Sequence, residues 1–271
     1  MSKSAPILLR RRIQLMLLIC LGHVAACGQA VAENTPPSKT EPTTVSWGTG
    51  FVVSDGFLLT SLHIVRDKSA VFVGAFGASS TGQPRWTKAE VVSTDANLDL
   101  ALLKARVDAP ALSLHPALLV PLGLEISIIG YPQPRFQGMS QKITQGIVNG
   151  YRNSDLQDTS SGYLQISAEV SQGNSGGPVL APDGTVIGMV QRKLNATKLA
   201  ERTEDLLINV NYALRSSELI RFLQTASVQP LVKTVSVETH LRPYQIYQKT
   251  QASVLAVIGR TSSAAQISPN P

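Results

Sequence analysis

Short apolar segments alternate with turn residues through the middle of the chain, from about residue 47 onward. Polar, glycine-containing stretches such as 54–56 (SDG) and 182–184 (PDG) separate them. Glycine, proline and aspartate at such points favour tight turns, and short apolar runs between turns are typical of antiparallel strands. We therefore expect an all-β fold.

The predicted strands fall into two groups, because a proline-containing stretch at 109–123 divides them. The first group is 49–53, 57–60, 70–74, 89–93 and 100–104, and the second is 125–130, 142–148, 163–167, 177–180, 185–190 and 207–210. Two groups of short strands joined by one connector predict two packed β-barrels or sandwiches. Residues 216–223 (SSELIRFL) then begin with serine and repeat apolar residues at helical spacing, which predicts a helix.

Residues 1–32 have the pattern of an export signal, with basic residues at 3 and 10–12, an apolar run at 13–21 and small residues after it. The apolar run is short for a membrane span. Residues 24–27 (VAAC) are typical of a lipoprotein signal, which would lipidate Cys27, whereas 30–32 (AVA) fits ordinary signal peptidase. Cys27 is otherwise only a small apolar residue of the signal. We predict export, either as a periplasmic or outer-membrane lipoprotein attached through Cys27 or as a secreted protein.

Removal of the signal changes the charge balance. The whole chain carries a formal charge of +6, but residues 1–32 hold four basic residues and no acidic one, which leaves 20 basic against 18 acidic. No strongly basic run remains, so we expect no nucleic-acid partner. Both cysteines lie in the signal region, and the remaining chain is long enough to fold without disulfides. No metal-binding cluster is evident, so we expect no cofactor.

The rest of the chain divides into three parts. Residues 33–44 (ENTPPSKTEPTT) are polar and contain proline, which predicts a flexible tether. The folded domain is predicted at 45–224, with lobes at about 45–115 and 120–224. A tail at 225–271 follows it.

The strongest chemical motif is the stretch 173–178 (GNSGGP). Serine is a weak nucleophile unless a base takes its proton and donors hold the developing oxyanion. The glycines allow a sharp bend, so backbone N–H groups of Gly173 and Ser175, in the frame Gly173-Asn174-Ser175, would form the oxyanion hole beside the nucleophile Ser175. The alternative is an ordinary glycine-rich hairpin turn.

A base and an orienting acid come earlier in the chain. His63 ends an apolar strand-like run in 58–65 (LLTSLHIV), and His23, His115 and His240 are weaker candidates because of their positions. Asp99 opens the apolar run 99–104 (DLALLK), where a buried carboxylate needs a partner. A histidine N–H would supply that partner, although a turn aspartate is the simpler alternative and Asp95 is its nearest competitor.

The motifs around these three residues, and their order His, Asp, Ser along the chain, resemble those of the chymotrypsin-fold serine peptidases. The resemblance is closest to the bacterial high-temperature-requirement (HtrA) type. The resemblance covers about 48–223 and includes 129–132 (IGYP), 144–148 (TQGIV), 163–167 (YLQIS) and 210–213 (VNYA). It implies two packed six-stranded antiparallel β-barrels with a C-terminal helix and a cleft between the barrels. It also implies that His63 takes the Ser175 proton and that Asp99 orients the histidine.

Three features differ from the family. Residues 225–271 are too few for a PDZ-like domain, so peptide activation is not expected. Glu169 lies six residues before Ser175, and the resemblance to the trypsin branch implies that this position is the base of a substrate pocket, where an acid would select basic residues. A shift of one residue would instead point Glu169 to the surface. Gly188 is a second pocket candidate. The family's usual opening helix and strand are missing before 47–50 (WGTG), but 244–250 and 253–259 (SVLAVIG) look like them. We therefore hypothesise that the tail supplies the first strand of the amino-terminal barrel, the alternative being a tail helix on the surface.

The function that these features predict is an exported serine endopeptidase that cleaves protein or peptide substrates through an acyl-enzyme. The alternative is a catalytically silent or latent peptidase-fold module that binds without turnover, because a fold does not guarantee activity. A third interpretation is an envelope lipoprotein in which the anchor matters more than catalysis.

Overall fold

The computed structural model describes residues 44–75, 85–151, 162–191, 211–236 and 238–261. The predicted signal with Cys27, nearly all of the predicted tether and the strand predicted at 207–210 lie outside these ranges. No helix within them is long and apolar enough to cross a membrane.

The first barrel closes in the order β1-β12-β3-β4-β5-β2. Its strands are β1 (Thr44–Ser54), β2 (Phe57–Ser61), β3 (Ala70–Ala75), β4 (Arg85–Asp95), β5 (Leu100–Lys104) and β12 (Val254–Thr261). Valine, leucine and alanine side chains from these strands form its core, because alternate residues of each strand point inward.

The second barrel closes in the order β10-β11-β8-β7-β6-β9. Its strands are β6 (Glu125–Gly130), β7 (Lys142–Tyr151), β8 (Tyr163–Ile166), β9 (Pro178–Leu180), β10 (Val186–Val190) and β11 (Asn211–Arg215). Helix α4 (Ser216–Thr225) follows β11 directly and packs against β10 and β11. Two six-stranded antiparallel barrels and a helix after them confirm the predicted fold class.

Two short helices were not predicted from the sequence. Helix α1 (Leu62–Val65) is a single turn after β2, where the apolar pattern had indicated the end of a strand. Helix α2 (Pro134–Gln137) lies between β6 and β7. Elements of four residues have too few apolar positions to show a helical period, so a sequence pattern cannot reveal them.

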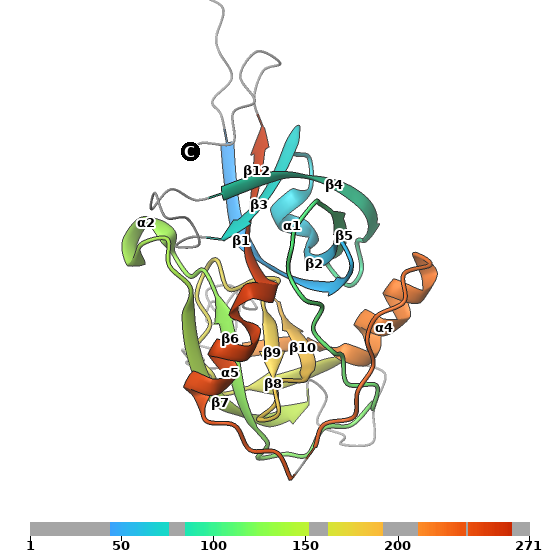
Figure 1. Cartoon of the computed structure of the whole chain (residues 1–271), viewed down its shortest axis with the longest axis vertical. Helices are drawn as coiled ribbons and strands as arrows, with labels where there is room; N and C mark the ends of the chain where they lie inside the picture. Colours follow the sequence, from blue (N-terminus) through green and yellow to red (C-terminus); the bar gives the residue numbers. More distant parts are fainter. Residues whose placement is uncertain (1–43, 76–84, 152–161, 192–210, 237, 262–271) are drawn as a thin grey trace, which may run out of the picture. The chain divides into compact units, whose positions relative to one another are not determined.

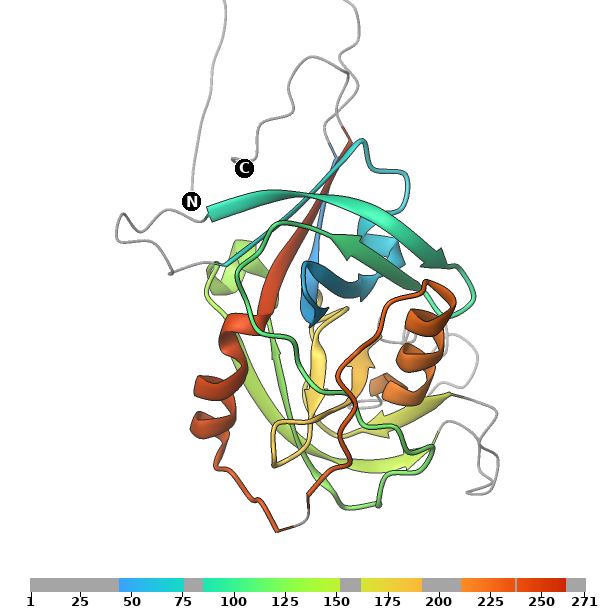
Figure 2. The same cartoon turned by 45° about the vertical axis from the view of Figure 1, so that its right-hand side comes forward.

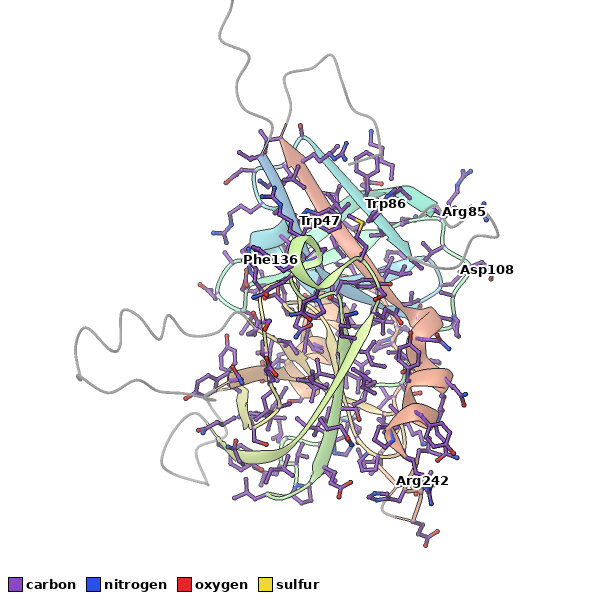
Figure 3. The ribbon with its side chains drawn as sticks, turned by 90° about the vertical axis from the view of Figure 1, so that its left-hand side faces the viewer. Trp47, Arg85, Trp86, Asp108, Phe136 and Arg242 are labelled. Atoms are coloured by element: carbon purple, nitrogen blue, oxygen red, sulfur yellow. The ribbon has the colours of Figure 1, made fainter. Side chains whose placement is uncertain are left out.

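The C-terminal strand β12 lies between β1 and β3 (Figure 1, red strand). It pairs antiparallel with β1 from Thr44↔Thr261 to Phe51↔Val254, and with β3 along its other edge. Trp47 of β1 and Trp86 of β4 pack edge to face across β12 and β3, with ring centroids 6.1 Å apart (Figure 3). The tail therefore closes a barrel that would otherwise have two open edges, which favour aggregation.

The tail reaches this position by passing along the second barrel. The N–H of Leu114, in the connector between the barrels, donates to Leu231 O at 2.8 Å, and the N–H of Lys233 donates to Leu114 O at 3.0 Å. Helix α5 (Pro243–Thr250) then packs on β6 and β7, and the short 3₁₀ turn η2 (Gln251–Ser253) leads into β12. Figure 2 shows α4 and α5 on different sides of the second barrel, with the tail segment between them.

A buried aspartate fastens the tail to the second barrel. Asp183, fully buried in the turn between β9 and β10, accepts hydrogen bonds from the Thr185 N–H at 2.9 Å, Lys233 Nζ at 3.0 Å and the Ser236 N–H at 3.1 Å. Burial by itself would raise the pKa of Asp183, but these donors outweigh it and hold the pKa below its ordinary value. Lys249 of α5 also donates to Asp183 O at 2.8 Å.

Candidate active site

Asp99 binds both the backbone and the side chain of His63. One carboxylate oxygen accepts the His63 N–H at 2.8 Å, and the other lies 2.6 Å from His63 Nδ1. The N–H of Leu62 donates to Asp99 O at 2.9 Å, so the start of α1 is fixed on the same residue. Because an ionised carboxylate only accepts hydrogen bonds, Nδ1 carries the proton and Nε2 is left as the acceptor.

Asp99 adopts a left-handed backbone conformation, with φ of 52°. Aspartate tolerates this region better than most residues, and strained backbone of this kind is frequent where a functional side chain must be aimed. Asp95, the competing aspartate, has a different task. Its Oδ1 accepts the N–H groups of Asn97 at 2.9 Å and Leu98 at 3.0 Å, so Asp95 shapes the turn that presents Asp99.

The stretch around Ser175 is a tight turn that depends on its glycines. Gly173 and Gly176 have φ of 103° and 82°, and the Gly177 N–H donates to Asn174 O at 2.9 Å. A Cβ atom on Gly173 would lie 2.3 Å from Tyr131 O, and one on Gly176 would lie 2.2 Å from Thr49 O. Both the conformation and the space therefore exclude a side chain at these positions.

Thr49 of β1 holds this turn against the first barrel. The Thr49 N–H donates to Ser175 O at 2.9 Å, and its hydroxyl donates to Gly173 O at 2.7 Å and accepts the Tyr131 N–H at 3.1 Å. Sequence reasoning did not identify Thr49. Its only signal is a small polar residue between Gly48 and Gly50 in an otherwise apolar strand.

Two N–H groups in this turn are available to a ligand. Within the part of the chain that the structure describes, the N–H groups of Gly173 and Ser175 donate to no other residue. The Asn174 N–H, by contrast, donates to Ser171 O at 3.0 Å. The inclusion of Asn174 as an oxyanion-hole residue is thus wrong, since its donor is already used within the turn.

Strand β10 joins the two parts of the site, a connection that the sequence did not reveal. Val190 O accepts the Gly176 N–H at 2.9 Å, and the Val190 N–H donates to Gly177 O at 2.8 Å. The next residue, Gln191, is nearly buried and its Nε2 donates to Leu98 O at 3.2 Å, directly before Asp99. The end of one strand therefore contacts both the nucleophile turn and the segment that carries the acid.

The two candidate pocket residues lie in the second barrel, Glu169 after β8 and Gly188 in β10. The Glu169 side chain is exposed, while its carbonyl accepts the Thr144 hydroxyl at 3.1 Å. A Cβ atom on Gly188 would lie 2.7 Å from Leu214 O, so the missing side chain makes room for the neighbouring strand. That these residues line a substrate pocket stays a prediction. In addition, the described residues contain no group of three or more histidine, cysteine, aspartate or glutamate side chains that could hold a metal ion.

The model of the family described as trypsin-like peptidase domain matches residues 48–189. This range contains His63, Asp99 and Ser175. The chain belongs to the trypsin-like peptidase family. Members of this family are serine-type peptidases, so the resemblance expected from the sequence is confirmed.

The chain is also similar to individual proteins over part of its length. An uncharacterized protein of Sinorhizobium fredii is 34% identical over 74% of this chain and 31% of its own length. A probable periplasmic DegP-like serine endoprotease of Halomonas elongata is 32% identical over 53% of the chain and 29% of its own length. A solved structure of the HtrA-type protease AlgW with a decapeptide superposes with a TM-score of 0.52, at 26% identity, over 66% of this chain and 51% of that one. The chain thus spans about a third of the length of these two curated relatives.

Proposed function

We propose that this trypsin-like peptidase is an exported serine endopeptidase that hydrolyses peptide bonds through an acyl-enzyme on Ser175. The observation that carries the proposal is the double contact of Asp99 with His63, because it fixes both the backbone and the tautomer of the base. A histidine held in this way has its second ring nitrogen ready to accept a proton.

The proposed reaction has two halves. In the first, Ser175 Oγ attacks the substrate carbonyl carbon while His63 Nε2 takes the hydroxyl proton. The N–H groups of Gly173 and Ser175 stabilise the oxyanion, and the C–N bond breaks as His63 protonates the leaving amine. In the second, water attacks the acyl ester, His63 takes a proton from the water, and Ser175 Oγ leaves with that proton. The ionised Asp99 stabilises the histidine cation in both halves.

Export and substrate class belong to the same proposal. The basic and apolar pattern of residues 1–32 supports export, as does the periplasmic location in the name of the Halomonas elongata relative. The decapeptide in the AlgW structure supports extended polypeptides as substrates. Cys27 would be the lipidated residue if the first of the two cleavage sites is used; incorporation of a labelled fatty acid, lost in Cys27→Ser, tests this.

Covalent labelling with a fluorophosphonate tests the catalytic proposal. We expect the wild-type protein to be labelled at Ser175, and labelling to be lost in Ser175→Ala and reduced at least about 10³-fold in His63→Ala. Ser171→Ala, a serine in the same turn, is the matched control and should still be labelled. A folded wild-type protein that is neither labelled nor active on unfolded protein substrates would contradict the proposal and favour a binding module.

A further inference from the structure

Helix α1, which carries His63, has little capacity to hold its own position. It is one turn long, and its characteristic hydrogen bond is Arg66 N–H to Leu62 O at 2.8 Å. Isolated helices of this length are unstable, because fixing the first turn costs more conformational entropy than one hydrogen bond returns. The position of His63 must therefore be set by the neighbours of α1. Asp99 is one of them, and the C-terminal strand β12 is another.

Strands β1 and β12 meet α1 at the carbonyl of Ile64, the residue after His63. The Ser46 hydroxyl lies 2.5 Å from Ile64 O and 3.2 Å from Gly259 O, and Ser46 and Gly259 are register partners. The Ser69 N–H and hydroxyl also bind Arg260 O, at 2.9 and 3.0 Å, so the segment after α1 is fixed to the same strand.

Gly259 leaves no spare room beneath this carbonyl. A Cβ atom on Gly259 would lie 2.3 Å from Ile64 O and 2.7 Å from Ser46 Oγ. On the other side, the Ile64 side chain fills the space over Gly48, where a Cβ atom would lie 2.0 Å from Ile64 Cδ1 and 3.1 Å from Ser175 O. Residue 64 is thus enclosed between two glycines of adjacent strands, and the second glycine also borders the nucleophile turn.

From these contacts we propose that the C-terminal strand positions the catalytic base, with Gly259 and Ser46 as positioning residues for His63. This inference rests on the proposed peptidase function. Neither residue reaches the reacting atoms; both act through the Ile64 carbonyl. Because β12 is the last strand that the structure describes and comes far after α1 in the sequence, His63 takes its working position only after the tail has inserted between β1 and β3. Peptidase activity is thereby coupled to completion and docking of the tail.

Gly259→Ala is the direct test, with Gly74→Ala as its matched control. At Gly74 of β3 a Cβ atom would lie 2.5 Å from Arg85 O, so both variants force a methyl group against a carbonyl of the first barrel, but only Gly259 touches α1. We expect Gly259→Ala to lower kcat about 10- to 100-fold with KM within about twofold, since a displacement of about 1 Å in a catalytic group has effects of this size. Gly74→Ala should change kcat less than about threefold at a comparable loss of stability.

Proton NMR supplies a readout that a merely structural role would not move. The proton between His63 Nδ1 and Asp99 should give a resolved low-field signal, which Gly259→Ala should shift or broaden and Gly74→Ala should leave in place. This measurement needs no turnover. If the wild-type protein is neither labelled by fluorophosphonate nor active on unfolded protein substrates, the proposed function fails, while the NMR signal still tests the positioning.

Ser46 gives a second pair of variants if Gly259→Ala does not fold. Ser46→Ala should lower kcat about fivefold to tenfold at unchanged KM, and Ser46→Thr, which keeps the hydroxyl, should restore it to within about twofold of wild type. Equal kcat values for Gly259→Ala and Gly74→Ala, or for Ser46→Ala and wild type, would overturn the inference. The inference would also be overturned if Gly259→Ala changed only KM, or if the low-field proton signal of His63 were the same in all variants.

Discussion

The two barrels have the same number of strands, but the strands of the first barrel are much farther apart along the chain than those of the second. The second barrel uses strands that follow one another between Glu125 and Arg215. The first barrel is complete only when β12 joins strands that were formed far earlier in the sequence. Closing such a long loop costs conformational entropy before its contacts form, so the first barrel should be the later one to close.

This difference coincides with a division of chemical work. The candidate nucleophile and its N–H donors belong to a turn of the second barrel, whereas His63 and Asp99 belong to the first. The base and acid therefore reside on the barrel whose closure depends on the tail. Asp183 strengthens this dependence, because it fixes the tail to the second barrel before the chain returns to the first.

The largest expected effect is a loss of kcat without a loss of folding stability, on replacement of the acid in the first barrel. Asp99→Asn should lower kcat about 10⁴-fold, because the amide no longer enforces the correct tautomer of His63. The fold should remain intact, as judged by circular dichroism and thermal unfolding. Asp95→Asn keeps an oxygen that can accept the Asn97 and Leu98 N–H groups, so its kcat should stay within about threefold of wild type. Equal losses in the two variants would refute the assignment of Asp99.

The next effect tests whether β12 is integral to the first barrel. Val257 is completely buried in β12, and Val257→Asp would place a charge without a partner in the core. We expect the free energy of unfolding to fall by about 4 kcal/mol, measured by urea denaturation. Val92→Asp in β4, at a side chain that is 44% exposed, is the control and should cost less than about 1 kcal/mol. Similar costs would mean that β12 is dispensable.

Folding kinetics can sharpen the contrast in assembly. Val257→Ala in β12 and Val190→Ala in β10 both remove fully buried methyl groups and should each cost about 2 kcal/mol. If β12 docks after the rate-limiting step, Val257→Ala should raise the unfolding rate about 30-fold and leave the folding rate unchanged. Val190→Ala should slow folding as well. Stopped-flow chevron plots measure both rates, and slower folding of Val257→Ala would show that the tail docks early.

The smallest effects concern the acid sensitivity of the tail attachment. The folded-state pKa of Asp183 is lowered, so its contribution to stability is complete above about pH 4 and is lost as the pH falls through the folded-state value. Burial lowers the pKa of His115, although a backbone hydrogen bond with Lys233 of the tail and the charge of Asp183 raise it. The contribution of His115 to stability is therefore complete above about pH 6.5 and declines below it.

As the pH is lowered from 8 to 3, thermal unfolding should accordingly show two successive losses of stability, the first from His115 and the second from Asp183. Asp183→Asn should remove the second loss and cost about 2 kcal/mol at pH 7, because Lys233 and the Ser236 N–H lose a charged acceptor. Asp55→Asn, at an exposed turn of the first barrel, is the control and should keep both losses. An unchanged acid profile in Asp183→Asn would exclude Asp183 as the group responsible.

Much of the fold and part of the site were accessible from the sequence. Turn residues and apolar runs located most strands, because the alternation of apolar and polar residues and the positions of turn residues are local properties of the sequence. His63, Asp99 and Ser175 could be named as candidates from their local frames. Thr49 and Gln191 could not, since each acts through hydrogen bonds to segments that are close only in the folded chain. Glu169 lies in the segment after β8, so the direction of its side chain depends on how that segment packs in the folded chain.

The all-β class, the two groups of strands and the residue types needed at a nucleophile turn can be derived without coordinates. These follow from local conformational preferences, such as the positive φ that Gly173 and Gly176 adopt. The folded chain was needed to show that β12 lies between β1 and β3, that Asp99 binds His63 twice, and that the Asn174 N–H is already occupied. Such facts depend on which distant groups meet, because hydrogen bonds and close packing act over a few ångströms in space, whatever the separation along the chain.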